Sequence, residues 1–319
     1  MSSLLSAAFI TSPDAVFARE VRDGLTDPVQ KTLPTRFLYD DVGSALFDAI
    51  TALEEYGLTR ADVRLIRENA GEIAALCPET EALVELGSGN GSKTRPLLDA
   101  LTPAPVYRPV DLSGAALDAC ARELHGFTVQ PIRAEFLAGL RKASAMRGNG
   151  RLLVAFLGSN IGNFERHAIP AFFRSVRECL EPGDRFLLGA DLVKDIDQLI
   201  LAYDDPAGVT AAFNRNLLAR VNRQLGADFR LPRYAHEARW SSAERRIEMH
   251  LRARSEQLVR VEALDLTVCL NEGETIWTES SHKFETEELK SLAQPVGFSC
   301  IQTWTDSHWP FAEILFRAV

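Results

Sequence analysis

One segment, an apolar strand that breaks into three glycines, says more about this chain's fold than any other. Residues 82–86 are mostly apolar with Glu85 near the end, and Gly87, Gly89 and Gly91 follow at alternate positions. Glycine has no Cβ atom, so the backbone of such a loop can turn sharply and approach a ligand closely. We therefore expect a strand-to-helix turn that binds a ligand. A glycine-rich turn without a ligand is the alternative reading of this segment taken alone.

The residues around the loop do not complete either common phosphate-binding sequence. A P-loop needs a glycine directly before its Lys-Ser/Thr pair, but Ser92 precedes Lys93 and Thr94. The dinucleotide-binding pattern needs its third glycine at the position that Ser92 occupies. What remains resembles the first motif of class I S-adenosylmethionine (SAM) methyltransferases, Glu85-x-Gly87-x-Gly89-x-Gly91.

A second acidic residue stands where a nucleoside would need it. Asp111 follows the short apolar segment 106–110 and precedes Leu112-Ser113, which is typical of a helix start. In nucleotide-binding α/β sheets a carboxylate at this place accepts hydrogen bonds from ribose hydroxyls. Because no phosphate-binding loop accompanies it, Asp111 favours SAM over NAD or ATP. Capping of the next helix is the alternative role.

Length and composition describe a soluble globular protein. The 319 residues are 46% hydrophobic and 25% charged, enough for an α/β domain and a second lobe. A net charge of -9 argues against a nucleic-acid partner, since phosphates are bound by basic surfaces. Met1-Ser2-Ser3-Leu4-Leu5 lacks the basic flank of a secretory signal, and no apolar run is long enough to span a membrane. We expect a cytoplasmic protein.

Cysteines and histidines give no sign of disulfides or of a metal. The five cysteines are scattered and odd in number, which favours reduced thiols in the cytoplasm. None of the six histidines has ligand spacing to another histidine or to a cysteine, so we expect no metal. No exposed apolar stripe calls for a protein partner, and we expect a monomer.

Apolar runs alternate with helical patterns from about residue 60 to 195, which predicts an α/β fold with a Rossmann-like, doubly wound parallel sheet. Ligands of such sheets bind at the carboxyl ends of the strands. The expected strands are 82–87, 106–111, 128–132, 151–157 and 185–190, with helices at 115–124 and 168–180. The residues then expected at one rim of the sheet are Gly87, Asp111, Glu135, Phe136, residues 158–163 and Asp191.

The pattern changes after this sheet. Residues 197–283 are too many for one crossover, and their alternating runs predict antiparallel strands with one wet face. The predicted elements are a helix at 211–224 and strands at 246–251, 258–270 and 274–278, then a helix at 285–293 and strands at 299–305 and 311–318 that close the sheet. We expect a methyltransferase core from 60–196 and 284–319, and a second α+β, substrate-binding lobe from 1–59 and 197–283.

Beyond the glycine loop, unusual strings from about Arg22 to Val319 closely resemble the histidine-specific Nα-methyltransferases of ergothioneine biosynthesis. They are Phe37-Leu38-Tyr39-Asp40, Gly43-Ser44-x-Leu46-Phe47-Asp48, Glu55-Tyr56, Thr59-Arg60, 156–163, 189–195, Ala202-Tyr203-Asp204-Asp205, 208–216, Ile247-Glu248-Met249 and 279–284. The resemblance implies a SAM-dependent transfer of three methyl groups to the α-amine of L-histidine, which gives hercynine.

The resemblance also implies roles for individual residues. The cofactor contacts would be Gly87, Lys93, Asp111, Glu135, Phe136 and Gly158. Asn163 and Tyr203 would hold the substrate carboxylate with Tyr56 nearby, Tyr39 and Phe47 would face the amine, and Glu279 and Ser281 would hold the imidazole. Tyr39 would be the catalytic residue, because it can orient the amine and help to pass its proton to solvent. Where the family has Asp-Phe this chain has Glu135-Phe136, and Glu135 can still accept a hydrogen bond from the adenine amine of SAM.

Each of these residues also has a structural reading. Tyr39, Phe47 and Tyr56 could be ordinary core aromatics, Asn163 a turn residue and Glu279 part of a solvated strand. Lys93 could be a solvated lysine, and Met249 could pack in the core or line the substrate pocket. The alternative functions are N-methylation of another amino acid, such as tryptophan or tyrosine, and a non-catalytic nucleotide-binding protein. Glu279 and Ser281 argue against the former, and Ser92 argues against a P-loop protein.

Overall fold

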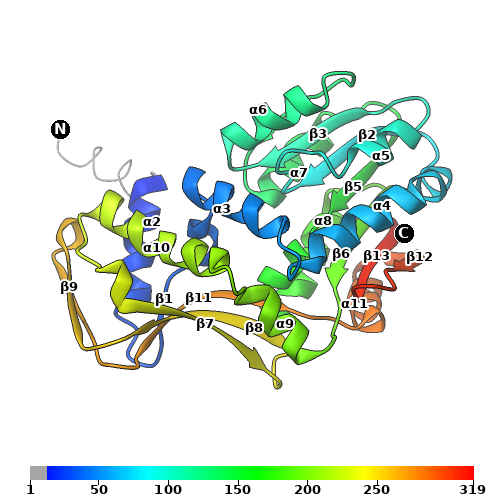
Figure 1. The fold of residues 1–319 in the computed structure, drawn as a ribbon. Coiled ribbons are helices and arrows are strands. Elements are labelled where there is room, and N and C mark those ends of the chain that lie inside the picture. Colours follow the sequence, from blue (N-terminus) through cyan, green and yellow to red (C-terminus); the bar gives the residue numbers. More distant parts are fainter. Residues whose placement is uncertain (1–12) are drawn as a thin grey trace, which may run out of the picture. The chain divides into compact units, whose positions relative to one another are not determined.

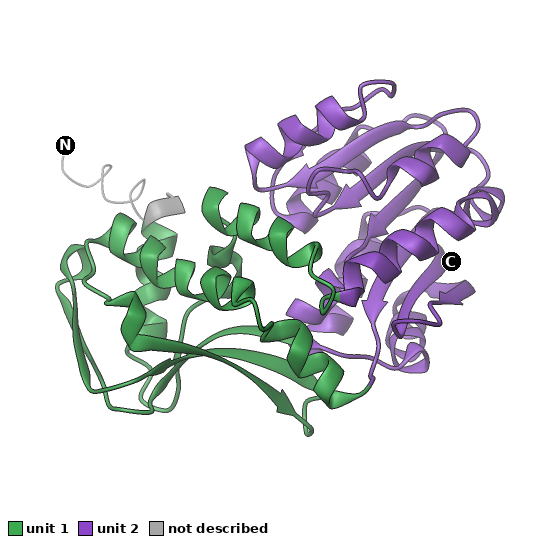
Figure 2. Ribbon diagram, viewed as in Figure 1, with its two compact units in different colours: residues 1–56, 195–281 green, residues 57–194, 282–319 purple. Residues whose placement is uncertain are grey.

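The computed structural model describes residues 13–319, which form two compact units (Figure 2). Unit 1 comprises the chain up to Tyr56 together with Asp195–Ser281, and unit 2 comprises Gly57–Lys194 and His282–Val319. The divisions expected from the sequence, at 59/60, 196/197 and 283/284, fall a few residues beyond these. The expectation about residues 1–5 lies outside the described residues.

Unit 2 is built on a seven-stranded sheet of order β12-β13-β6-β5-β2-β3-β4 (Figure 1). Five strands run parallel: β2 (Thr80–Leu86), β3 (Val106–Asp111), β4 (Ile132–Arg133), β5 (Arg151–Phe156) and β6 (Arg185–Asp191). The last two form an antiparallel hairpin, in which β13 (Phe311–Ala318) lies between β6 and β12 (Phe298–Thr305). The sheet is therefore mixed at one edge and parallel elsewhere, which brings the carboxyl ends of five strands to one rim.

Helices cover both faces of this sheet. On one face lie α7 (Phe136–Ala145), α8 (Ile169–Glu178) and α11 (Thr286–Ala293), and on the other α4 (Gly57–Leu76), α5 (Arg95–Ala100) and α6 (Gly114–Glu123). The first group packs on alternate strand residues such as Val84 and Val154, both fully buried. Because both faces are covered, the parallel strands read as nearly continuous apolar runs.

Unit 1 has a smaller, four-stranded sheet of order β1-β11-β8-β7. Its strands are β1 (Lys31–Thr32), β11 (Thr275–His282, whose last residue belongs to unit 2), β8 (Arg246–Ala253) and β7 (Tyr234–Ser241). A separate hairpin pairs β9 (Gln257–Val261) with β10 (Leu266–Leu270). The helices of this unit are α2 (Pro13–Leu25), α3 (Asp41–Thr51), α9 (Ile196–Tyr203) and α10 (Val209–Leu225), and the last two pack on β7 and β8 (Figure 1).

Two predicted strands differ from the structure, and some of the observed elements were not predicted. The strand expected at 128–132 is only the two-residue β4, preceded by one bridge between Tyr107 and Val129. The run 258–270 is two strands, because a 3-10 helix at Glu262–Leu264 and the left-handed Asp265 (φ 44°) reverse the chain. Neither β7 nor α9 was predicted, since β7 mixes charged and apolar residues and α9 has only eight residues.

The chain passes between the units at three places, and residues beside all three meet inside unit 2. Asp191 binds Lys283 (2.9 Å) and Lys194, and it accepts a hydrogen bond from Trp309 Nε1 (2.9 Å). Gly57 lies against the Trp309 ring, where a Cβ atom would come within 2.2 Å of the ring. Burial and the neighbouring Lys283 lower the pKa of Lys194 to about 8, against the pull of Asp191.

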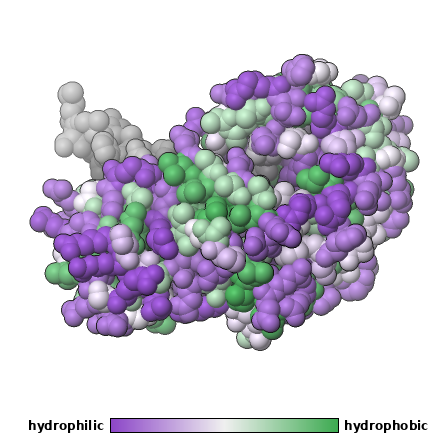
Figure 3. All heavy atoms as spheres, in the orientation of Figure 1, coloured by the Kyte–Doolittle hydropathy of each residue, from purple (hydrophilic) through white to green (hydrophobic). Residues whose placement is uncertain are grey.

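On the face that Figure 3 shows, hydrophilic residues predominate, with smaller hydrophobic areas among them. Among the helices described, none combines the length and apolar character needed to cross a membrane.

Candidate functional site

The glycine loop of unit 2 requires glycine for two reasons. Gly87, Gly89 and Gly91 have φ angles of 77°, 53° and 72°, a region that other residues rarely adopt. Space is also short, because a Cβ atom on Gly87 would lie 2.9 Å from Asn160 Nδ2 and one on Gly91 2.6 Å from Cys120 Sγ. The loop therefore exposes main chain at the carboxyl end of β2, as a close-fitting ligand requires.

Asp111 ends β3 and is fixed beside this loop. Its Oδ2 accepts a hydrogen bond from the Gly89 amide (3.2 Å), and its Oδ1 accepts one from the Ser113 amide (2.9 Å). Ser113 itself caps α6 through Ala116 (3.2 Å), so the capping role that the sequence left open for Asp111 is filled by another residue. Each Asp111 oxygen retains a lone pair for a ribose hydroxyl.

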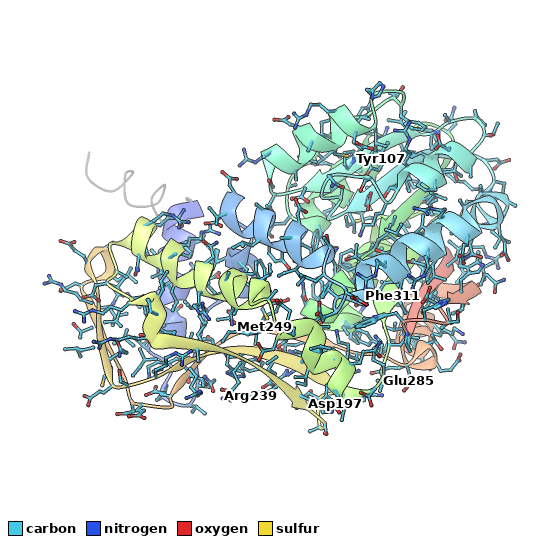
Figure 4. The ribbon with its side chains drawn as sticks, viewed as in Figure 1. Tyr107, Asp197, Arg239, Met249, Glu285 and Phe311 are labelled. Atoms are coloured by element: carbon cyan, nitrogen blue, oxygen red, sulfur yellow. The ribbon has the colours of Figure 1, made fainter. Side chains whose placement is uncertain are left out.

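Glu85 supports the loop from behind. The side chain is fully buried, and its Oε2 accepts hydrogen bonds from Thr94 Oγ1 (2.6 Å) and from the hydroxyl of Tyr107. These bonds join β2, β3 and the residue that precedes α5 (Figure 4 labels Tyr107). The acidic residue of the motif thus holds the two strands and the far end of the loop together.

Lys93 is not a solvated surface lysine. Its Nζ lies 3.1 Å from Oδ2 of the buried Asp62, and a Cβ on Gly158 would come within 3.0 Å of it. Burial lowers the pKa of Lys93, but the carboxylates of Asp62 and Glu85 outweigh that effect and raise it above its usual value. Lys93 therefore carries a positive charge next to Gly158, where a ligand carboxylate could be bound.

A further buried acid, Glu313 on β13, lies near Lys93 and Asp62. Both of its oxygens, and Asp62 Oδ1, lie buried without a hydrogen-bond donor. Burial and the adjacent Asp62 raise the pKa of Glu313 well above its usual range, so Glu313 is a neutral acid that can donate to Asp62. The sequence prediction missed this pair, although Glu313 is the one charged residue in the apolar run 311–316.

The two remaining elements of the rim adjoin the loop. Glu135 precedes α7 without capping it, and Phe136 packs on Phe156 (ring centroids 5.2 Å apart) with an edge 3.2 Å from the Cβ position of Gly87. After β5, Gly158 and the non-glycine Ser159 are both left-handed (φ 71° and 57°). Ser159 Oγ accepts a hydrogen bond from the Asp191 amide (2.9 Å), which compensates for the strain.

Unit 1 contains a chain of aromatic rings. Tyr39 packs on Phe47 (5.5 Å between centroids), Phe47 on Tyr56 (6.2 Å), and Tyr56 on Tyr203 (5.9 Å). Phe213 of α10 packs on both Tyr39 (5.5 Å) and Phe47 (6.0 Å). The sequence prediction missed Phe213, although it lies in one of the strings that carried the resemblance.

Polar groups lie at both ends of this chain of rings. The Tyr203 hydroxyl and Ser281 Oγ are hydrogen-bonded at 2.8 Å. Glu279 is 8% exposed, and its charge reaches Tyr39. Although 37% of Tyr39 is exposed, loss of water around its hydroxyl and the nearby Glu279 raise the pKa of Tyr39 well above its usual range. Tyr39 is therefore a neutral phenol at physiological pH.

Tyr39 is held by α10. The neighbouring Asp40 caps α3 through Gly43 (2.8 Å), accepts a hydrogen bond from Asn216 Nδ2 (2.7 Å) and pairs with Arg223. A Cβ atom on Gly43 would lie 1.7 Å from the Leu38 carbonyl oxygen, so only glycine fits there. The string around Tyr39 thus encodes a rigid turn that fixes the tyrosine.

The structure divides the predicted site residues between the two units. Unit 2 brings together all six cofactor candidates and contains Asn163, the last residue of the 3-10 helix Asn160–Asn163. Unit 1 brings together Tyr39, Phe47, Tyr56, Tyr203, Glu279 and Ser281. Met249 is 1% exposed on the α10 side of β8 (Figure 4), which suits its structural reading as a core residue. Within residues 13–319 no cluster of three or more His, Cys, Asp or Glu side chains could hold a metal ion.

The strand order of unit 2, with its reversed strand next to β6, its glycine loop and the carboxylate after β3, is the cofactor-binding fold of class I SAM-dependent methyltransferases. The chain belongs to the family described as "Histidine-specific methyltransferase, SAM-dependent", whose model matches residues 17–318. It is accordingly a SAM-dependent methyltransferase.

Curated relatives are similar over most of the chain. A "Histidine N-alpha-methyltransferase" from Mycobacterium tuberculosis is 45% identical over 300 residues, and 92% of each chain is covered. A protein of the same name from Mycolicibacterium smegmatis is 46% identical over 295 residues, with 90% of each chain covered. "Ergothioneine biosynthesis protein 1" from Neurospora crassa is 28% identical over 86% of this chain and 32% of its own length.

Proposed function

We propose that this enzyme transfers methyl groups from SAM to the α-amine of L-histidine, three in succession, to give hercynine in the first step of ergothioneine biosynthesis. The family membership supports histidine as substrate, and the names of the mycobacterial and Neurospora relatives support the α-amine and the pathway. The observation that carries the proposal within this chain is the group formed by Tyr39, Tyr203, Glu279 and Ser281 in unit 1.

The residues of unit 2 fit SAM. Asp111 has acceptor oxygens for a ribose, Lys93 has a positive charge for a carboxylate, and Phe136 presents an apolar ring beside the open main chain of the loop. When bound, SAM supplies an electrophilic methyl carbon, and we assign its binding to Gly87, Lys93, Asp111, Glu135, Phe136 and Gly158. No metal is needed for a methyl transfer from a sulfonium.

The residues of unit 1 fit a small zwitterion with an imidazole. We assign Glu279 and Ser281 to the imidazole nitrogens, and Tyr203, with Tyr56 beside it, to the carboxylate. Asn163 keeps the carboxylate role that the family resemblance implies. A hydrogen-bonding site of this kind can discriminate by roughly 10⁴–10⁵ against a side chain that leaves its polar groups unpaired. Met249 is buried in the same unit, and we assign it to lining the substrate pocket.

Alignment is the main task of the protein in this reaction. Holding the amine nitrogen in line with the methyl carbon can contribute about 7–11 kcal/mol to lowering the barrier. We assign Tyr39, as a neutral phenol, to accepting a hydrogen bond from the amine, which orients the amine lone pair. Tyr39 also helps to pass to solvent the proton that the nitrogen must lose at each transfer. The rings of Tyr39 and Phe47 favour each methylated ammonium product by about 0.5–2 kcal/mol. Transfer stops at the quaternary amine, which has no lone pair.

Two further expectations remain predictions: a cytoplasmic location and a monomer without nucleic-acid, membrane or protein partners. Size-exclusion chromatography coupled to light scattering tests the second, because a dimer would elute at twice the mass of 35.3 kDa.

The proposed function is tested by mass spectrometry of the purified enzyme with SAM and each amino acid in turn. We expect histidine alone to gain three methyl groups, with mono- and dimethylhistidine as transient products. Methylation of tryptophan or tyrosine in preference to histidine would replace this proposal with the alternative substrate. Binding of SAM without methylation of any amino acid would support the non-catalytic alternative.

A further inference from the structure

A buried histidine in unit 1 has no role in the chemistry described above. His236 lies on β7, in register with Leu251 of β8, and its side chain is 1% exposed. Both ring nitrogens lie within hydrogen-bond distance of another group: Nε2 is 2.7 Å from the carbonyl oxygen of Tyr203, and Nδ1 is 2.9 Å from Asn214 Nδ2. The ring therefore connects β7 to both α9 and α10.

These neighbours fix the position of the ring proton. Asn214 Nδ2 also donates to the carbonyl oxygen of His250 (3.2 Å), which can only accept, so the amide nitrogen must face both groups. An amide nitrogen cannot accept a hydrogen bond, so His236 Nδ1 must be unprotonated and the single ring proton is on Nε2. That proton is donated to the Tyr203 carbonyl oxygen.

The electrostatic surroundings agree with a neutral ring. Burial lowers the pKa of His236 and Arg215 acts in the same direction, whereas the bond to Tyr203 and the charges of Asp204 and Asp205 oppose them without prevailing. The closer carboxylate, Asp204, lies 3.8 Å from Nε2 and is largely exposed.

The hydrogen bond from His236 is made to Tyr203, the residue of α9 that we assign to the substrate carboxylate. Tyr203 is the last residue of α9, and its carbonyl group has no partner within the helix, as is general for the final turn. Its side chain packs on Tyr56 and shares a hydrogen bond with Ser281. Fixing the main chain of Tyr203 therefore fixes the angle at which its hydroxyl meets Ser281.

We propose that Asn214 and His236 are positioning residues that hold Tyr203, and through it Ser281, in the geometry needed to bind the amino-acid substrate. This inference rests on the proposed function, because it takes Tyr203 and Ser281 as substrate contacts. It also explains two consecutive residues of α10: Phe213 packs on Tyr39 and Phe47, while Asn214 binds His236. Helix α10 thus supports both the residues assigned to the amine and the residue assigned to the carboxylate.

The chain offers a matched control for His236. His250 on β8 is also buried, with its side chain 3% exposed, but its ring stacks on Trp277 (5.9 Å) and contacts Glu248 and Thr275. These ring contacts are separate from the bond between His236 and Tyr203. Replacing His250 by Asn therefore perturbs a buried histidine ring of the same sheet and leaves in place the main-chain carbonyl group that accepts the bond from Asn214.

The kinetic test compares His236→Phe, His236→Gln and His250→Asn. We expect His236→Phe to raise the KM for histidine about tenfold, as the loss of a buried hydrogen bond implies, while kcat and the Kd for SAM stay within about twofold. Gln carries a donor at the distance of Nε2 and should restore most of the affinity. A His236→Phe enzyme with the KM of the His250→Asn control would overturn the inference, as would a Gln variant no better than Phe.

The spectroscopic test is a ¹⁵N NMR measurement of the histidine tautomers in the intact enzyme. We expect His236 to be neutral at pH 7, with its proton on Nε2. A proton on Nδ1, or a cationic ring at pH 7, would overturn the positioning role while leaving the proposed function intact. Tyr203→Phe tests the assumption beneath it. If that variant keeps the wild-type KM for histidine, the assigned role of Tyr203 fails, and the positioning role fails with it whatever the tautomer.

Discussion

The residues proposed to bind SAM in unit 2 and those proposed to bind histidine in unit 1 differ in their chemistry. The proposed cofactor site of unit 2 contains buried charges, with Lys93 beside the carboxylates of Asp62 and Glu85. The half-site of unit 1 rests on aromatic rings and hydroxyl groups around Glu279. A rim of charges suits a ligand with its own carboxylate and ribose, whereas rings suit an amine that gains methyl groups.

The units also differ in how far apart in the sequence their interacting residues lie. In unit 2 the bond from Gly89 to Asp111 spans 22 residues, and most cofactor candidates follow successive strands. In unit 1 the bond from Tyr203 to Ser281 spans 78 residues, and that from Asn216 to Asp40 spans 176. The proposed cofactor site is thus close to a local motif, whereas the proposed substrate site needs distant segments to pack together.

The largest effect expected from this contrast is in Glu279→Ala. Removing the carboxylate assigned to the imidazole should lower kcat/KM for histidine about a thousandfold or more, while the Kd for SAM changes less than about twofold. Steady-state kinetics and calorimetric titration with SAM measure the two. Glu237→Ala, in an exposed ion pair with Arg239 on the same sheet, is the control. Wild-type histidine kinetics in Glu279→Ala would refute the assignment.

Asp111→Asn should weaken the binding of SAM and leave the binding of histidine unchanged, the reverse of Glu279→Ala. Loss of the charged acceptor at the end of β3 should weaken SAM binding by about 10- to 100-fold, and at saturating SAM the KM for histidine should stay unchanged. Asp99→Asn, at the exposed end of α5, controls for a general loss of one negative charge. An equal rise in both constants would mean that the two half-sites are not energetically separate.

Glu313→Gln tests whether Glu313 is protonated in the folded protein, through the free energy of unfolding at different pH values. Because the pKa of Glu313 is raised in the folded protein, its contribution to stability is full at acid pH and is lost as the pH rises above the unfolded value, near 4.5. A neutral amide removes this loss, so the variant should gain on the wild type by up to about 1.4 kcal/mol per pH unit above that value. Urea unfolding at pH 5, 7 and 8.5 measures the difference, and a gap that does not widen with pH would contradict a protonated Glu313.

The smallest effect is expected at the rim. Glu135 has no cap bond in the structure, so its proposed contact with the adenine amine is its one assigned role. Glu135→Gln keeps an acceptor oxygen and should raise the Kd for SAM about fivefold or less, with no change in melting temperature. A loss as large as that of Asp111→Asn would show that Glu135 does more than contact the adenine.

Single residues show which parts of the site could be predicted. Gly87 and Asp111 were predicted from the residues alone, because a strand followed by glycine or by a carboxylate has a local meaning. Tyr39 and Glu279 were named only through the resemblance, since each reads equally well as a core or a solvated residue. Phe213, Glu313 and His236 were missed, because their roles depend on neighbours that the sequence does not put beside them.

The sequence by itself determined the class of the protein, the glycine loop and the order of the main elements, because strand periodicity and backbone freedom act over a few residues. Tertiary structure alone decided that 258–270 forms two strands, that Lys93 is paired with Asp62, and that α10 carries both the ring and the amide that support unit 1. The physical reason is that hydrogen bonds and ring contacts are made by whichever groups packing brings within reach, and packing depends on the whole chain.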